Sequence, residues 1–258
     1  MIPDNKVFLI TGASSGIGKE ISILLSKEKC SLALLARRTE LLNKLTEQLN
    51  GAAAKVKSFT CDVSDKNAVE SVIINVKEVF GGIDVAILNA GVGYKSSAEN
   101  INSEKAKTVF NVNLFGMANF IEILLPDFIK RRNGMIAGVT SLADSRGWPG
   151  SGFYCASKAA GTRLLESLRS ELKKYNIKVV TVKPGFVKTE MTAKNKFRMP
   201  FIMGADKAAR IIVNGLKKEK EIIQFPLPSV LGTKLTHIVP DFLIDYFVSK
   251  ESTGDSNK

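Results

Sequence analysis

Residues 6–18 read KVFLITGASSGIG, an apolar, β-branched run followed at once by a glycine-rich turn. The run predicts a β-strand over residues 6–11, and a helix is expected over 16–29. Gly12 permits a tight turn, Gly16 lets the backbone approach a phosphate, and Gly18 lets the helix pack on the strand. The first N–H groups and the positive dipole end of such a helix attract anions. The segment therefore predicts a pyrophosphate site formed by Gly12, Ser14, Ser15, Gly16, Ile17 and Gly18.

Outward from this segment, short aliphatic runs alternate with longer amphipathic stretches as far as residue 225. Such alternation predicts parallel strands joined by right-handed helical crossovers. The expected fold is α/β: a Rossmann-like, doubly wound, seven-stranded parallel sheet with helices on both faces, in a single domain over residues 1–258. The polar residues 251–258 are expected to be frayed. Further strands are expected at 31–36, 55–60, 83–88, 135–140, 178–183 and 221–225, and helices at 40–49, 66–80, 104–131, 152–175 and 207–218.

The end of the second strand bears on which coenzyme the site accepts. Dinucleotide folds that bind NAD carry an acidic residue near this point, which holds the ribose hydroxyls. Here Ala36 is followed by Arg37 and Arg38. A guanidinium matches a 2′-phosphate in charge and geometry, so NADP(H) is favoured over NAD(H), with Arg37 the better candidate for the contact. The alternative is that both arginines merely begin a solvated helix.

Composition excludes several other classes of protein. The net charge is +12, but the lysines are dispersed, which indicates a solvated basic surface rather than a nucleic-acid site. The three cysteines lie far apart and the only histidine is His237, so no metal site, disulfide framework or Ser-His-Asp triad is predicted. There is no uninterrupted apolar run of about 18 residues and no secretion signal at the start, so a cytoplasmic protein is expected.

Further motifs follow in order along the chain. Asn89-Ala90-Gly91 follows the fourth strand, Asn113 lies in NVNLFG (111–116), Ser141 follows the fifth strand, and Tyr154 precedes Lys158 by four residues. With the TGxxxGxG pattern of 11–18, Asp62-Val63 and PGFVKT (184–189), this sequence resembles the short-chain dehydrogenase/reductase family over about residues 6–225. The resemblance implies coenzyme contacts, beyond the glycine turn and the arginines, from Asp62, Val63, Asn89, Ala90, Gly91, Tyr154, Lys158, Pro184, Gly185, Val187 and Thr189. Asp62 could instead cap the next helix.

The resemblance also implies a reaction, which is hydride transfer between NADP(H) and a carbonyl or secondary alcohol, in the reductive direction. Tyr154 is the expected acid/base. The ammonium of Lys158, one helical turn away, should lower the tyrosine pKa, and Lys158 should also hold the nicotinamide ribose. Ser141 is expected to donate to the substrate oxygen, and Asn113 to anchor a water beside Lys158. An inactive NADP(H)-binding regulatory or scaffold protein is the alternative, and the complete set of four residues argues against it.

The remaining expectations concern the substrate side and the tail. Residues 190–204 should form a lid whose Met and Phe content suits an apolar or lipid-like substrate, or which simply packs on the body. The apolar segment 226–250 could cover the cleft or join subunits, and we rank these interpretations first. Contact with a membrane surface ranks second. The family likeness implies a homodimer or homotetramer through helices 104–131 and 152–175. Asp144 replaces a small residue and is expected at the substrate entrance, while Cys155 is expected to be a small buried residue rather than a reactive one.

Overall fold

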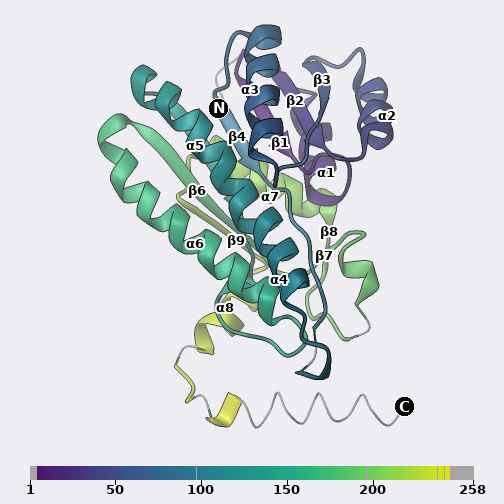
Figure 1. Cartoon of the computed structure of the whole chain (residues 1–258), viewed down its shortest axis with the longest axis vertical. Coiled ribbons are helices and arrows are strands. Elements are labelled where there is room, and N and C mark those ends of the chain that lie inside the picture. The colour runs from purple at the N-terminus through teal and green to yellow at the C-terminus, as the bar shows by residue number, and fades with distance from the viewer. Residues whose placement is uncertain (1–4, 97, 196, 237, 241, 245–258) are drawn as a thin grey trace.

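The computed structural model describes residues 5–96, 98–195, 197–236, 238–240 and 242–244 (Figure 1). Its main sheet has seven strands, all parallel, in the order β3-β2-β1-β4-β5-β6-β9. The seven-stranded parallel sheet expected from the sequence is therefore confirmed. The strands are β1 Val7–Thr11, β2 Ser31–Ala36, β3 Lys55–Thr60, β4 Val85–Leu88, β5 Gly134–Val139, β6 Ile177–Pro184 and β9 Ile222–Phe225.

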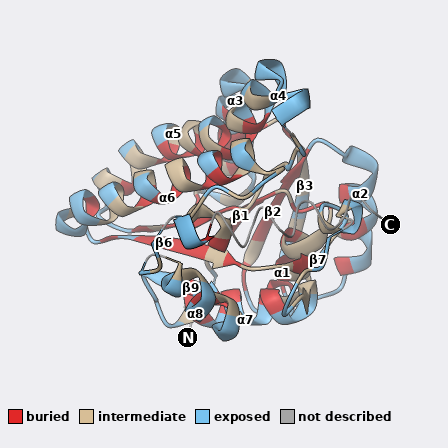
Figure 2. Ribbon diagram, turned by 90° about the horizontal axis from the view of Figure 1, so that it is seen from below, coloured by how far each residue is buried: buried red, intermediate tan, exposed pale blue. Residues whose placement is uncertain are grey.

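Helices cover both faces of this sheet (Figure 2). Alternate residues of a strand point to opposite faces, so Phe8 and Ile10 of β1 belong to one apolar core and Leu9 to the other. Central strands are buried on both faces, which is why they read as continuous apolar runs. The first core lies against α1 (Gly16–Leu25), α2 (Thr39–Leu49) and α7 (Ala205–Lys217), and the second against α3 (Lys66–Phe80), α5 (Gly116–Arg131) and α6 (Gly152–Leu172).

The strand order reverses beside β1. The chain runs outward through β2 to β3 and then returns to β4 on the other side of β1. In open α/β sheets, ligands bind outside the carboxyl ends of the strands at such a reversal. Here the glycine-rich turn after β1 meets the segment after β4, and Asn89 Nδ2 donates to the carbonyl oxygen of Thr11 at 3.0 Å.

Two helices differ most from their predicted bounds, whereas the others begin and end within three residues of them. α1 ends at Leu25 rather than at residue 29, because residues 27–29 are exposed and a longer helix would bury nothing there. The helix predicted over 104–131 is divided into α4 (Ser103–Phe110), a π-helical segment Asn111–Phe115, and α5. A π turn inserts one residue into the helical ladder, and apolar periodicity carries no signal for it.

The stretch Ser103–Arg131 has the length and hydropathy of a membrane-spanning helix, although it contains no uninterrupted apolar run of that length. In its most apolar window, 44% of the residues are buried inside the protein. Phe120, Leu124 and Phe128 are among them and pack in the second core. Burial against the sheet accounts for these apolar side chains.

The last third of the chain holds the predicted lid and extension. β7 (Val187–Lys188) pairs with β8 (Met203–Gly204), and the segment between them corresponds to the predicted lid. After β9, α8 (Leu227–Leu235) exposes Leu227, Leu231 and Leu235 and buries Val230. His237 and residues 245–258, which include the predicted frayed tail, lie outside the described residues.

Candidate active site

A cavity of about 490 Å³ opens at the carboxyl ends of the strands. Clefts of this size are usual for small molecules and cofactors. Every residue predicted for the site lines it except Gly18 and Asn113. The predicted residues in its wall are Gly12, Ser14, Ser15, Gly16, Ile17, Arg37, Arg38, Asp62, Val63, Asn89, Ala90, Gly91, Ser141, Tyr154, Lys158, Pro184, Gly185, Val187 and Thr189.

The glycine-rich turn has the geometry that a phosphate cradle needs. Gly12 and Gly16 have φ of +66° and +54°, a region that L side chains rarely adopt. Gly18 lies behind the cavity wall, where a Cβ would collide with the carbonyl oxygen of Gly12. Ser15 precedes α1 without capping it through its side chain, so the first N–H groups of the helix keep their capacity to bind an anion. The turn therefore fits a phosphate-bearing cofactor.

The two arginines after β2 reach different neighbours. Arg38 donates from Nε to Ser14 Oγ at 3.2 Å and from Nη2 to Ser15 Oγ at 2.6 Å, so it lies against the glycine turn. Arg37 is held less closely, with Nη1 3.7 Å from Asp62 Oδ2. The sequence favours Arg37 for the 2′-phosphate contact, and this stays a prediction: both arginines line the cavity, and Arg38 is the one held against the glycine turn.

Asp62 lies in the cavity wall and does not cap α3. The cap is Asp65, whose carboxylate accepts from the backbone N–H groups of Asn67 and Ala68. Burial acts to raise the pKa of Asp62, but hydrogen bonds from Ser64 and the nearby Arg37 guanidinium hold it below its usual value. Asp62 is therefore an anionic acceptor in the cavity wall.

Asn89 braces the glycine turn from the neighbouring strand. Its side-chain amide donates to the carbonyl oxygens of Thr11 and Gly12 at 3.0 and 3.3 Å. The Thr11 hydroxyl in turn accepts from the backbone N–H groups of Asn89 and Ala90 at 2.9 and 3.0 Å. The turn after β4 thus fixes the shape of the turn after β1.

Three polar side chains meet in the part of the cavity beside α6. Tyr154 and Lys158 lie one turn apart on this helix, with Lys158 Nζ 5.8 Å from the centroid of the Tyr154 ring. Lys158 donates to the carbonyl oxygen of Val139, the last residue of β5, at 2.9 Å. Ser141, two residues further on, makes a side-chain hydrogen bond with Tyr154. A hydroxyl pair beside an ammonium can hold a carbonyl oxygen and exchange a proton with it.

The expected lowering of the tyrosine pKa is wrong for this structure. Burial raises the pKa of Tyr154 above its ordinary value and outweighs the opposing hydrogen bond with Ser141. Burial also lowers the pKa of Lys158 to about 8, although the carboxylate of Asp144 acts in the opposite sense. The sequence argument considered the nearby charge and left out desolvation, which acts on both groups.

Asn113 lies beside Lys158, but its amide is already engaged. Oδ1 accepts from the backbone N–H of Val92 at 2.8 Å, and Nδ2 donates to Val92 O at 2.9 Å and to Ser157 Oγ at 3.0 Å. A Cβ added at Gly91 would lie 3.2 Å from Lys158 Nζ and 3.3 Å from Asn113 Oδ1, which places both groups next to this glycine. Asn113 can hold the expected water only through the second lone pair of Oδ1 or through its backbone carbonyl.

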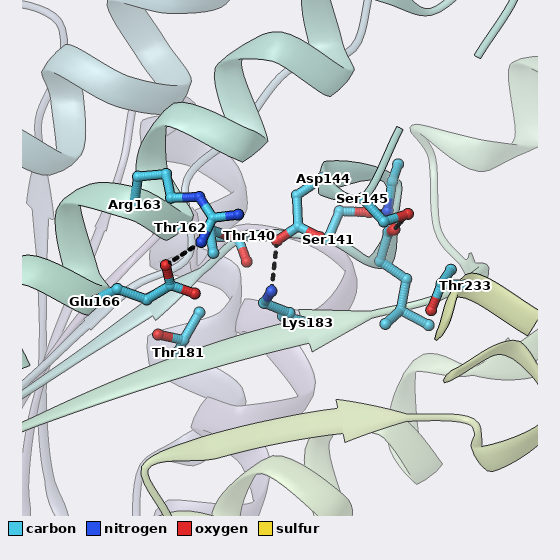
Figure 3. Close-up of polar contacts among 12 residues, drawn as sticks. Thr140, Ser141, Asp144, Ser145, Thr162, Arg163, Glu166, Thr181, Lys183 and Thr233 are labelled. Carbon is cyan, nitrogen blue, oxygen red and sulfur yellow. Dashed lines mark hydrogen bonds and ion pairs between the residues drawn. The ribbon is translucent and has the colours of Figure 1, made fainter. Parts of the chain in front are cut away.

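Asp144, which the sequence suggested for the substrate entrance, is not among the residues that line the cavity, and its side chain points to Lys183 (Figure 3). Its side chain is 5% exposed and its Oδ2 lies 2.9 Å from Lys183 Nζ. Thr162 Oγ1 donates to the same oxygen at 2.5 Å. Asp144 is therefore the acidic partner of a largely buried ion pair, and sequence reasoning did not recognise its partner Lys183, which precedes Pro184.

The lid contributes Met191, one of the methionines on which the expected apolar character of the lid rests, and also Glu190, Thr192 and Lys194, which sequence reasoning did not single out. Of its apolar residues, Met191 lines the cavity, while Phe197 packs edge-on against Phe186 with ring centroids 5.8 Å apart. Phe201 is 59% exposed. Of Met191, Phe197 and Phe201, only Met191 therefore lines the cavity.

Of the cysteines, Cys61 lines the cavity and Cys155 does not. Burial raises the pKa of the Cys61 thiol to about 11. Cys155 is buried, and burial raises its thiol pKa, which agrees with the expected small buried residue. Among the described residues there is no cluster of three or more His, Cys, Asp or Glu that could hold a metal ion.

Comparisons with known proteins agree with this geometry. A family model described as short chain dehydrogenase matches residues 6–199. The 3-oxoacyl-(acyl-carrier-protein) reductase FabG of Thermotoga maritima is 34% identical and covers 86% of this chain and 88% of its own length. A Burkholderia phymatum short chain dehydrogenase/reductase in complex with NAD superposes with a TM-score of 0.84 at 23% identity, covering 91% and 93% of the two chains. The alcohol dehydrogenase of the archaeon Thermococcus sibiricus, complexed with 5-hydroxy-NADP, gives 0.78 at 28% identity over 86% and 96%.

Proposed function

The chain belongs to the short-chain dehydrogenase/reductase family of oxidoreductases, and from this premise we propose that it is an NADP(H)-dependent enzyme that reduces a carbonyl compound to a secondary alcohol. The observation that carries the proposal is the meeting of Ser141, Tyr154 and Lys158 in a cavity whose far wall is an uncapped, glycine-rich helix start. One end of the cavity suits phosphate, and the other suits a carbonyl oxygen.

When bound, the coenzyme supplies the hydride, and the side chains of this chain manage the proton. The Ser141 hydroxyl donates to the substrate oxygen and holds it beside Tyr154, which gives that oxygen its proton. The ammonium form of Lys158 stabilises the tyrosinate that remains and anchors the nicotinamide ribose. Asn113 ties the π-helical segment to Val92 and keeps the wall next to Lys158 in place.

The preference for NADP(H) is supported by the charges around the expected 2′-phosphate position. Arg37 and Arg38 both line the cavity, and no carboxylate stands at Ala36 to bind ribose hydroxyls. The Thermococcus alcohol dehydrogenase, a relative in fold and sequence, is complexed with an NADP analogue. The remaining coenzyme contacts that we propose are those of the predicted residues in the cavity wall.

The substrate that we propose is an apolar or lipid-like carbonyl compound, since Met191 adds an adaptable apolar surface to the cavity. We also propose a homodimer or homotetramer that joins through α4, α5 and α6, as is typical of the family. Neither the family nor the described part of α8 supports the membrane contact considered for residues 226–250. The cytoplasmic location stays a prediction.

Isotope transfer tests this function. The protein is incubated with NADPH that carries deuterium on the transferable position and with a panel of ketones, β-keto esters and long-chain aldehydes. We expect deuterium on the carbinol carbon of at least one alcohol product. Tight NADPH binding with no transfer to any carbonyl, in either direction, would instead favour a cofactor-binding regulatory or scaffold protein.

A further inference from the structure

A carboxylate from the lid lies on Arg38, one of the two arginines proposed for the coenzyme 2′-phosphate. Arg38 Nη1 lies 2.6 Å from Glu190 Oε2, across a separation of 152 residues. Nε and Nη2 of the same guanidinium are engaged by the hydroxyls of Ser14 and Ser15, at 2.6–3.2 Å. All three nitrogens of Arg38 therefore already have an acceptor, and Glu190 is the only anionic one among them.

A carboxylate and a phosphate make the same demand on a guanidinium, namely parallel N–H donors and positive charge. Both cannot accept from the same N–H of Nη1, and two anions at one arginine repel each other. One N–H of Nη1 stays open to the 2′-phosphate, so NADP(H) must either displace Glu190 or bind Arg38 beside it against the repulsion of its carboxylate. NAD(H) carries a hydroxyl at that position and can leave the ion pair intact.

We propose that Glu190 is a specificity-determining residue, whose carboxylate competes with the 2′-phosphate for Arg38 and so narrows the preference for NADP(H) over NAD(H). The inference rests on the proposed function, because it assumes a coenzyme in the cavity with its adenosine end near Arg38. It adds a residue from the lid to a recognition site otherwise built from the β1 and β2 turns.

The solvent exposure of the Arg38–Glu190 ion pair determines how strongly Glu190 should affect NADPH binding. The side chains of Arg38 and Glu190 are 46% and 62% exposed, so water and salt screen their attraction. Exposed ion pairs contribute little, so removing the carboxylate should tighten NADPH binding by about two- to fivefold and no more.

The test titrates wild type and Glu190→Gln with NADPH and with NADH, following coenzyme fluorescence. We expect the Kd for NADPH to fall by about two- to fivefold and the Kd for NADH to stay unchanged. The difference should shrink in about 1 M salt, where charges are screened over roughly 3 Å. Thermal unfolding of both proteins establishes that the change in ratio is not a change in folding.

Glu40→Gln is the matched control for loss of a nearby negative charge. Glu40 lies in the first turn of α2, close to Arg38 in sequence, and makes no ion pair with Arg38 within the described part of the chain. It should change the ratio of the two Kd values less than Glu190→Gln does. In an Arg38→Gln background, Glu190→Gln should have no effect on NADPH, because the contested group is gone.

Three results would overturn the inference: an unchanged ratio, an effect equal to that of Glu40→Gln, or weaker binding of both coenzymes, which would make Glu190 a clamp over the bound dinucleotide. Failure of the proposed function looks different. If wild type binds neither coenzyme, the proposed function falls and this inference with it. If wild type prefers NADH but Glu190→Gln shifts the ratio towards NADPH, the coenzyme assignment is wrong and the role of Glu190 stands.

Discussion

At the scale of single residues, the cavity contains a lysine whose charged form is destabilised by burial. Lys158 is 4% exposed and donates a hydrogen bond to the carbonyl oxygen of Val139. Burial brings its pKa from 10.5 down to about 8. A group that binds its proton less tightly when folded destabilises the fold wherever the unfolded chain is still protonated. The position next to Tyr154 is therefore held at a cost in stability.

Replacing Lys158 with methionine should raise the stability of the protein while abolishing turnover. Below pH 8 the gain should be roughly 3 kcal/mol, because folding lowers the pKa of the lysine from 10.5 to about 8 and each tenfold change in proton affinity corresponds to about 1.36 kcal/mol. Between pH 8 and 10.5 the folded lysine is neutral and the unfolded one still charged, so wild-type stability rises with pH and the gain shrinks. Denaturant unfolding of both proteins across pH 7–10 measures it, and a constant difference would contradict the pKa assignment.

The residues in and around the site differ in how readily they could be predicted from the sequence. Ser141, Tyr154 and Lys158 were predictable because their motifs are short and ordered. Asp144 and Glu190 were not, because their partners are Lys183 and Arg38, residues far away in the chain that the fold brings together. No local pattern encodes those pairs. Asp144 is unusual in the sequence, but the direction of its side chain could not be predicted. It points to Lys183 because the fold brings β6 beside it.

At the scale of elements, the buried ion pair joins the turn that carries Ser141 to the end of β6. Asp144 closes the 3-10 turn Leu142–Asp144, for which Ser141 is the N-cap, and Lys183 lies next to Pro184 at the end of β6. The Ser141 hydroxyl and the Pro184 carbonyl oxygen are themselves 3.4 Å apart. The pair therefore holds two walls of the cavity together.

Asp144→Leu should destabilise the protein by about 3 kcal/mol, because it leaves the ammonium of Lys183 without its partner in a poorly solvated place. Lys183→Met should destabilise the protein by a similar amount, because it leaves the carboxylate of Asp144 without its partner. The double variant Asp144→Leu with Lys183→Met should cost much less than the sum of the single changes, since no unpaired charge is left. Denaturant unfolding gives the three values, and strict additivity would mean that the two side chains do not interact.

Element boundaries followed from the sequence wherever apolar periodicity was strong. Strands β2 and β3 and helix α3 begin and end where predicted, because each is set off by polar residues or an N-cap such as Asp65. The π-helical segment Asn111–Phe115 was missed, since its stability comes from the bonds of Asn113 to Val92 and Ser157 rather than from local propensity. Tertiary contacts settle such local exceptions.

At the scale of the whole molecule, the proposed oligomer makes a direct prediction. Phe115 is 54% exposed and ends the π-helical segment between α4 and α5, two of the helices that are proposed to join the subunits. Phe115→Asp should shift the protein from dimer or tetramer towards monomer in analytical ultracentrifugation. Leu41→Asp, at an exposed position on α2, is the control and should leave the assembly intact. A monomeric wild type would refute the proposed assembly.

The fold of the whole chain was predictable because one rule governs it. Alternating strands and helices leave a parallel, doubly wound sheet as the arrangement that buries every apolar run. The small β7–β8 pair and the course of the lid were not predictable, since they follow from how residues after Pro184 pack on the finished sheet. The sheet and the lid both contribute to the cavity wall.

The central claim is that Tyr154 supplies the proton at an NADP(H) site, and Tyr154→Phe tests it most directly. Wild type and variant are compared for NADPH binding and for turnover of a carbonyl compound found active in the isotope screen. Loss of the general acid should lower kcat by at least about 100-fold, while the Kd for NADPH stays within about twofold of wild type, because the ring and Lys158 remain. A variant that binds NADPH and turns over like wild type would contradict the account.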